Sequence, residues 1–395
     1  MKLALHIGTA RTGTTTLQTW FSANRAGLAD QGICYPTSPG VKNHRRLMIY
    51  AFDTVVSESM LTNLGIRSES DHEAFRSKTR EDLAHEIALS QEMGHHTWIM
   101  SSELLHSRIA KPSMINRLNA LLKPHFSQIT VYLHLRPQVD LLVSNASQTA
   151  RNGAQVNRAD LTRHGVSAVS NFYNYNNFVT NWEGVFGAQN LRLVPYRRIP
   201  DITGFMIDEL LIDSSRLPPV VSVNPSLDWQ ALALSNAVQT GFAKLGLGKA
   251  PGLFLDEMKG SERLQLGRAL AQELQARFDD CNTKLSQRRS DITFEELTPD
   301  WSQHDEIGNL DIVEAPCLFA PQVALVMRRL AQDNAMERWR RHIAEGRLAA
   351  VTGDMAALDA AKRAAKDVAA ELEALGRSVA GDLEAANTDA GVGQK

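Results

Sequence analysis

The first residues of this chain that could do chemistry form a glycine loop near its start. The loop reads Gly-Thr-Ala-Arg-Thr-Gly-Thr-Thr over residues 8–15, and its two glycines have the spacing of a nucleotide phosphate loop. Thr14 stands where such loops carry the lysine that binds ATP, and a different cation, Arg11, lies inside the loop. Backbone N–H groups at such a loop favour an anion. The sequence therefore predicts a phosphate site that is not that of an ATPase.

The neighbouring sequence supplies elements that could position this loop. Residues 3–7 form a short apolar run typical of a buried strand, and apolar residues recur at helical spacing after Gly13 as far as Leu28. Gly32 stands where that helix would end. The order strand, loop and helix predicts an anion at the helix N-terminus, where Thr14 and Thr15 add hydroxyl donors.

A second candidate phosphate contact lies further along the chain. Residues 129–135 read as a buried strand, Arg136-Pro137 ends it, and residues 139–150 can form a helix that carries Ser144. An arginine offers phosphate a two-pronged set of N–H donors, and Ser144 can add a hydroxyl. Taken alone, Arg136 could be a solvated strand end and Ser144 an ordinary polar helix residue.

Together the two motifs resemble those of the sulfotransferases that use 3′-phosphoadenosine 5′-phosphosulfate (PAPS). In that family the first loop reads roughly Pro-Lys-[Ser/Thr]-Gly-Thr-Thr and holds the 5′-phosphosulfate. The resemblance implies this role for Arg11 in place of the lysine, although a guanidinium is planar and bulkier than an ammonium. It implies the same role for the matching residues Thr12, Gly13, Thr14 and Thr15.

The family holds the 3′-phosphate with an arginine at a strand end and a serine eight positions later, which implies this role for Arg136 and Ser144. Residues 191–196 resemble a later strand of the family that usually ends in Tyr-Glu. Here Tyr196 is present and Arg197 replaces the glutamate. Residues 98–103, 223–226 and 277–285 show weaker similarity, so the resemblance covers roughly residues 1–300.

Sulfuryl transfer needs a base for the acceptor's proton, and two residues compete for that role. Glu103 follows the strand predicted at 97–101, close to where many family members place a catalytic His or Glu, but it could equally begin the next helix. His44 lies in a loop with Lys42, Arg45 and Arg46, and histidine transfers protons near neutral pH, but it could be a solvated loop residue. We favour Glu103.

The acceptor is predicted to be a hydroxylated molecule, with a carbohydrate favoured. Four aromatic residues between 172 and 178 alternate with asparagines, and such surfaces often suit sugars, although aromatic residues at that spacing are more often core. Residues 37–75 and 151–170 lack clear periodicity and are candidate acceptor loops.

Two other functions stay open at this point. A phosphate-loop kinase or NTPase would need the missing lysine and an acidic Mg²⁺ ligand after an apolar strand, where Glu103 is the only nearby acid. A non-catalytic nucleotide-binding relative is the other alternative, which the departures at Arg11 and Arg197 leave open. We expect no metal, because His95-His96 has no ligand partner at useful spacing.

Composition sets the broad class. The chain has 395 residues, 43% hydrophobic and 22% charged, and a net charge of −2, which gives no general attraction to nucleic acid or to an anionic membrane. No apolar run approaches a membrane span or a signal peptide, and three scattered cysteines suit a reducing compartment, so we expect a cytoplasmic protein.

Apolar strands alternate with helical patterns, which predicts an α/β fold with a parallel sheet flanked by helices. We expect this sulfotransferase-like domain over residues 1–300, a C-terminal helical extension over 301–385 and a disordered tail over 386–395. Helical stretches at 320–346 and 354–384 show no sustained heptad, and we interpret them as packing helices or an oligomer arm. The sequence leaves the oligomeric state open.

Overall fold

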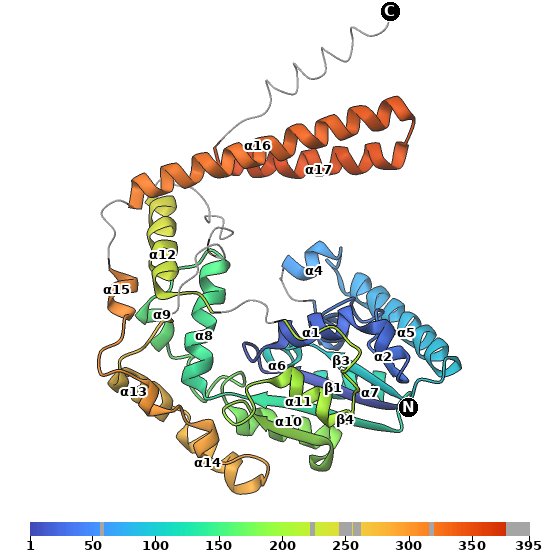
Figure 1. Cartoon of the computed structure of the whole chain (residues 1–395), viewed down its shortest axis with the longest axis vertical. Helices are drawn as coiled ribbons and strands as arrows, with labels where there is room; N and C mark the ends of the chain where they lie inside the picture. The colour runs from blue at the N-terminus through green and yellow to red at the C-terminus, as the bar shows by residue number, and fades with distance from the viewer. Residues whose placement is uncertain (56–58, 222–225, 245–254, 256–261, 316–319, 377–395) are drawn as a thin grey trace, which may run out of the picture. The chain divides into compact units, whose positions relative to one another are not determined.

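A computed structural model describes the chain except for residues 56–58, 222–225, 245–254, 256–261, 316–319 and 377–395 (Figure 1). The described residues form one five-stranded sheet, in which every strand is parallel and the order is β2-β3-β1-β4-β5. The strands are β1 (Lys2–Gly8), β2 (Ile33–Cys34), β3 (Thr97–Ser101), β4 (Gln128–Leu135) and β5 (Leu191–Pro195). The predicted α/β fold with a parallel sheet and a C-terminal helical region is confirmed. The two-residue strand β2 was missed because it is too short to show periodicity.

Alternation of side chains along the strands gives the sheet two buried faces. Leu3, Leu5 and Ile7 of β1 point to one face, and Ala4 and His6 point to the other. The helices that cover the first face include α3 (Arg46–Ala51), α5 (Glu69–Glu92), α7 (Pro112–Leu122) and α10 (Tyr175–Phe186), and those that cover the second are α1 (Thr14–Ala23), α2 (Arg25–Ala29) and α11 (Ile202–Glu209). Burial on both faces explains why these strands read as continuous apolar runs.

The structure describes further helices in both parts of the chain. They are α4 (Ser59–Asn63), α6 (Leu104–Arg108), α8 (Gln138–Arg151), α9 (Arg158–Thr162), α12 (Trp229–Lys244), α13 (Arg268–Ala276), α14 (Asp279–Arg288), α15 (Leu310–Glu314), α16 (Ala320–Thr352) and α17 (Met355–Ala374), with short 3-10 turns at Ala188–Asn190, Glu295–Leu297 and Trp301–Gln303.

Several sequence predictions need correction. The first helix was predicted to continue past Leu28, but Asn24 separates α1 from α2, and its side chain donates to the Trp20 carbonyl. Residues 37–75 were predicted to be irregular, yet they contain α3, α4 and the start of α5. The long helix α5 begins at a capping box, in which Ser68 accepts from the Asp71 N–H and Asp71 accepts from the Ser68 N–H.

Contacts divide the chain into two compact units. Unit 1 contains residues 1–145, 161–226 and 266–307, and it holds the whole sheet. Unit 2 contains residues 146–160, 227–265 and 308–395. Segments that we had placed in a single domain over 1–300 therefore contribute to both units. Whether residues 1–300 and 301–385 fold as separate domains stays a prediction, and the tail predicted at 386–395 lies outside the described residues.

The C-terminal helices of unit 2 are longer than most helices of the chain. Helices α16 and α17 run side by side as a hairpin that turns at residues 353–354 (Figure 1). Their seam buries Met336 and Trp339 of α16 against Val368 and Leu372 of α17. No helix among the described residues is long and apolar enough to cross a membrane.

Candidate functional site

The glycine loop predicted to bind phosphate lies between β1 and α1, in the order strand, loop and helix that the sequence predicted. Gly8 and Gly13 adopt positive φ values of 101° and 89°, which glycine tolerates without strain. Arg11 also has a positive φ, 64°, which is costly for a residue with a Cβ. The Thr12 hydroxyl donates to the Thr9 carbonyl at 2.8 Å and closes the loop on itself. The loop therefore has a fixed, locally strained shape, and such strain is common at binding sites.

The end of β4 holds this loop from the other side. Thr9 N–H donates to the His134 carbonyl at 2.8 Å, and the Arg136 guanidinium donates to the Arg11 carbonyl at 3.1 Å. The Arg11 guanidinium in turn donates to the Ser144 hydroxyl on α8 at 3.3 Å. The two motifs recognised separately in the sequence thus lie in contact.

Arg136 is positioned by contacts that leave part of its guanidinium available. Its carbon Cζ lies 5.1 Å from the centre of the Tyr196 ring, and its backbone carbonyl accepts from the Tyr175 hydroxyl at 2.7 Å. Its Nε is buried and has no hydrogen-bond partner among the described residues. Tyr196 itself continues from β5, where its N–H donates to the Leu135 carbonyl. Buried N–H donors are normally paired, so this one can donate to an acceptor from a water or a ligand.

The topology explains why these groups meet. The chain leaves β1 toward β2 and β3 on one side, and it places β4 and β5 on the other. Ligands in open parallel sheets bind at the carboxyl ends of the strands beside such a reversal. The phosphate loop follows β1 and Arg136 follows β4, so both lie at that position.

Sequence reasoning missed a carboxylate beside this cluster. Asp140 lies in the first turn of α8, four residues after Arg136. Burial raises the pKa of Asp140, although the charges of Arg136, His304 and Arg197 lower it. His304 Nε2 lies 4.0 Å from the Asp140 carboxylate. Its position four residues after Arg136 was the sequence feature from which Asp140 could have been predicted. A carboxylate here opposes anion binding when ionised and not when protonated.

Glu103 lies at the opposite side of the loop, against Gly8. A Cβ on Gly8 would lie 3.1 Å from the Glu103 Cα, which is tighter than most Cβ contacts, and the positive φ of Gly8 also favours glycine there. Glu103 occupies the N-cap position of α6, but its side chain does not cap that helix. Instead the carboxylate accepts from Gln18 Nε2 at 2.8 Å and from Asn43 Nδ2 at 3.0 Å. Sequence analysis named neither amide, because their positions become informative only once the loop and α1 are folded.

The amide of Asn43 is itself held in place. Its Oδ1 accepts from the Ser102 hydroxyl at 2.8 Å, which orients the Nδ2 donors toward Glu103. Gln18 donates on its other side to the Ser101 hydroxyl at 3.2 Å, and Ser101 contacts His6 Nδ1 at 2.8 Å. The carboxylate is therefore fixed by amide donors that carry no charge.

His44, the other candidate base, has different surroundings from those predicted. Its side chain is fully buried, Nδ1 accepts from the Ser101 N–H at 2.8 Å, and Nε2 lies 3.1 Å from the Pro36 carbonyl. Burial lowers the pKa of His44 to about 3. Both ring nitrogens are engaged by backbone, so the expectation of a loop imidazole free to accept a proton does not fit these contacts. His44 instead fastens the loop that carries Asn43 to the end of β3.

Two of the aromatic residues between 172 and 178 lie in the core and not on a surface. Tyr175 and Phe178 are buried in the core of unit 1. The Asn174 side chain caps α10 by accepting from the Asn177 N–H, and Asn177 donates to the Asn171 side chain. These contacts build the start of α10, and a carbohydrate acceptor stays a prediction.

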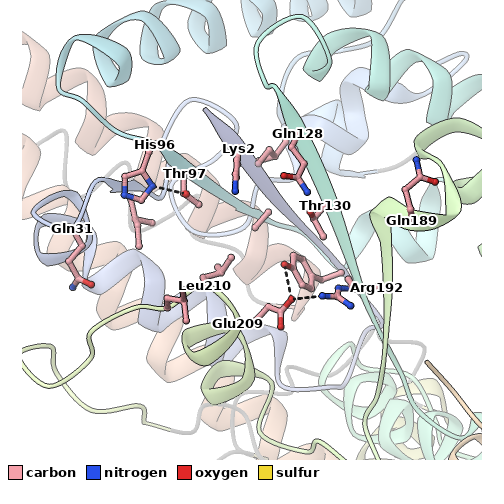
Figure 2. Close-up of a pocket in the computed structure, with 15 residues that line it drawn as sticks. Lys2, Gln31, His96, Thr97, Gln128, Thr130, Gln189, Arg192, Glu209 and Leu210 are labelled. Carbon is pink, nitrogen blue, oxygen red and sulfur yellow. Dashed lines mark hydrogen bonds and ion pairs between the residues drawn. The ribbon is translucent and has the colours of Figure 1, made fainter. Parts of the chain in front are cut away.

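A groove of about 730 Å³ lies at the other edge of the sheet, along the amino ends of the strands (Figure 2). Lys2, Thr97 and Gln128 begin their strands there. Arg192 pairs with Glu209 at 3.4 Å, and the Tyr132 hydroxyl donates to the same carboxylate at 3.5 Å. None of the predicted site residues lines this groove.

Metal binding has no visible support in the part of the chain that the structure describes. No group of three or more His, Cys, Asp or Glu side chains there could hold a metal ion. That the reaction needs no metal stays a prediction.

Comparisons with known proteins add one likeness. No protein-family model matches the chain, and no curated protein matches it. Among solved structures, a sulfotransferase from Alicyclobacillus acidocaldarius is similar with 16% sequence identity and a TM-score of 0.33, over 62% of this chain and 95% of that one. The function proposed below rests on the residues of the site.

Proposed function

We propose that this protein transfers a sulfuryl group from PAPS to a hydroxyl group of an acceptor. The observation that carries the proposal is the contact between the phosphate loop and the Arg136–Ser144 pair at the carboxyl edge of the sheet, with Glu103 held beside the same loop. A donor with a 5′-phosphosulfate and a separate 3′-phosphate suits two anion-binding elements that lie side by side.

The cationic residues would divide the donor's charge between them. The backbone N–H groups at the start of α1, the hydroxyls of Thr14 and Thr15, and Arg11 would hold the 5′-phosphosulfate. Arg136 and Ser144 would hold the 3′-phosphate, and the buried Arg136 Nε supplies a donor for it. Tyr196, which packs on the Arg136 guanidinium, would keep that group in place.

Chemistry at this site requires one bond to form and one to break. The acceptor oxygen attacks sulfur, the bond between sulfur and the bridging phosphate oxygen breaks, and adenosine 3′,5′-bisphosphate leaves with the electron pair. Arg11 would stabilise the negative charge that develops on the leaving phosphate. Glu103 would accept the acceptor's proton, since its carboxylate is oriented by Gln18 and Asn43.

The alternatives make different demands on the same residues. A kinase or NTPase needs a cation at position 14, which is Thr14 here, and an acidic residue that binds Mg²⁺. A non-catalytic relative would bind the nucleotide yet have no use for a fixed carboxylate beside the loop. The contacts of Glu103 therefore favour the catalytic proposal over the binding one.

Transfer of radiolabelled sulfate tests the proposal. The purified protein would be incubated with [³⁵S]PAPS and hydroxylated acceptors that include sugars, phenols and lipids, and labelled products would be separated. We expect label on a hydroxyl group and release of adenosine 3′,5′-bisphosphate. Transfer of ³²P from γ-labelled ATP with no transfer of ³⁵S would instead establish the kinase alternative.

A further inference from the structure

The side of helix α16 that faces away from α17 carries exposed aliphatic side chains toward both of its ends. Its buried side, with Met336 and Trp339, packs on α17. On the opposite side, Val326, Leu330, Leu348 and Val351 are 60%, 53%, 66% and 86% exposed. Exposed aliphatic side chains that gather at two places on one helix face are candidates for an interaction surface. We call this face of α16, from Val326 to Val351, the outer stripe.

The spacing of the outer stripe keeps its members in line. Asp333, Glu337, Arg341 and Ala344 continue it between the two apolar ends, and all four are exposed. Successive members of the stripe are alternately three and four residues apart. At Glu337 two spacings of four residues follow one another, so the heptad repeat is interrupted there. The mean step is about 3.6 residues, which is the period of a straight α-helix, so the stripe runs along one side without supercoiling.

The order of residue types in the outer stripe is nearly the same when it is read from either end. It begins with two aliphatic residues and ends with two, and its middle holds Glu337 followed by Arg341. A second copy of α16 that packs antiparallel, with its twofold axis near Trp339, would place Val326 against Val351 and Leu330 against Leu348. The same arrangement places Glu337 of each copy against Arg341 of the other.

We propose that two copies of this chain associate through the outer stripes of their α16 helices in an antiparallel arrangement. The contact is isologous, because the same surface of each copy forms it, so that a residue pair across the interface occurs twice. Such interfaces close as dimers. Each apolar contact and each Glu337–Arg341 pair occurs twice. A parallel arrangement is disfavoured, because it would oppose Glu337 to Glu337 and Arg341 to Arg341.

The length of the stripe suits a dimer contact. Twenty-five residue steps of an α-helix span about 38 Å at 1.5 Å per residue. The hairpin with α17 stiffens this length, since the seam on the other side of α16 is packed. The four aliphatic residues supply the apolar burial, and the central charges fix the direction and register.

Sedimentation velocity on the full-length chain tests the proposal with charge reversals. We expect the unaltered protein to be a dimer. Glu337→Arg or Arg341→Glu alone places like charges together twice and raises the dimer dissociation constant about 3- to 30-fold. The double variant E337R/R341E restores the opposite-charge pairs and with them the dimer. Lys362→Glu, an exposed charge reversal on α17, is the control and leaves the dimer unchanged.

A substitution at the apolar ends gives an independent measurement. Leu330→Lys places a lysine against Leu348 of the other copy and should weaken the dimer about 10- to 100-fold, with helix content by circular dichroism unchanged. A protein that is monomeric at all concentrations overturns the proposal. So does a dimer that tolerates both single charge reversals and Leu330→Lys. Neither result depends on sulfuryl transfer, because the site lies in unit 1 and the stripe in unit 2.

Discussion

The two sides of the phosphate loop are built from different kinds of contact. On the Glu103 side, an anionic side chain receives protein donors from Gln18 and Asn43, and these donors are in turn fixed by Ser101 and Ser102. On the Arg136 side, a cationic side chain donates to the Arg11 carbonyl, packs on Tyr196 and keeps a buried Nε without a partner among the described residues.

This difference indicates that the two sides of the loop have different functions. A carboxylate that uncharged donors already orient is suited to act as a general base, because a base must approach the acceptor's proton in one geometry. A guanidinium that is held by a carbonyl and an aromatic ring retains donors for an anionic ligand. We therefore expect changes on the Glu103 side to affect turnover and changes on the Arg136 side to affect donor affinity.

The largest expected effect is on turnover. Glu103→Gln keeps the size of the side chain but cannot accept the acceptor's proton, so kcat should fall by about 10²–10⁴-fold while donor affinity changes little. Glu209→Gln, at the opposite edge of the sheet, is the matched control and should retain kcat. Near-normal kcat in Glu103→Gln, measured by steady-state transfer, would remove Glu103 from the base role.

Donor affinity should respond to the other side. Arg136→Ala removes a charged donor to the 3′-phosphate and should weaken binding of adenosine 3′,5′-bisphosphate by about 1.5–3 kcal/mol, whereas Ser144→Ala should cost less. Adenosine 5′-phosphosulfate lacks the 3′-phosphate, so its affinity should scarcely change. Isothermal titration measures both ligands, with Arg192→Ala as the control. Equal losses for the two ligands would show that Arg136 does not contact the 3′-phosphate.

His44 should affect stability more than turnover. His44→Asn loses buried contacts with the Ser101 N–H and the Pro36 carbonyl, and it should lower the free energy of unfolding by about 1–3 kcal/mol. The folded variant should keep a kcat within a few-fold of the unaltered enzyme's. A well-folded but inactive variant would return the base role to His44.

The pH dependence of stability gives a second measurement on His44. Its pKa is about 3 when folded and about 6.5 when unfolded, so neutral His44 contributes stability above pH ~6.5. That contribution is lost as the pH falls toward 3. Chemical denaturation across this range should show a shallower loss of stability in His44→Asn than in the unaltered protein.

The smallest expected effect is an increase in donor affinity. Asp140→Asn removes a negative charge beside Arg136 and should tighten binding of adenosine 3′,5′-bisphosphate about 2- to 5-fold at neutral pH. Because the pKa of Asp140 is raised, binding to the unaltered protein should also tighten as the pH falls through that pKa, and the variant should lack this component. Weaker binding in Asp140→Asn would mean that the carboxylate supports the donor instead of opposing it.

Much of this architecture could be predicted from short, strong signals. Strands buried on both faces gave continuous apolar runs, and the glycine loop was visible because Gly8 and Gly13 need positive φ values. Arg136 and Ser144 were found through the resemblance and not through any feature of their own. The sheet order, which the sequence did not give, is what brings the ends of β1 and β4 side by side.

The contacts that distinguish one candidate base from the other could not be predicted. Asn43 and Gln18 donate hydrogen bonds to Glu103 from 60 and 85 residues away in the chain. No local sequence pattern predicts such a contact. The burial of His44 depends on the backbone of Pro36 and Ser101, which the sequence does not place. The self-complementary order of the outer stripe was present in the sequence, but its exposure became known only when α17 was seen to cover the other face of α16.

We propose above all that the loop and Arg136 together hold a donor with a separate 3′-phosphate. Thermal-shift titration of the unaltered protein with adenosine 3′,5′-bisphosphate, and in parallel with ATP and Mg²⁺, tests it most directly. We expect the bisphosphate to raise Tm with increasing concentration, and ATP with Mg²⁺ to raise it weakly or not at all. An equal rise with ATP, or no rise with the bisphosphate, would contradict it.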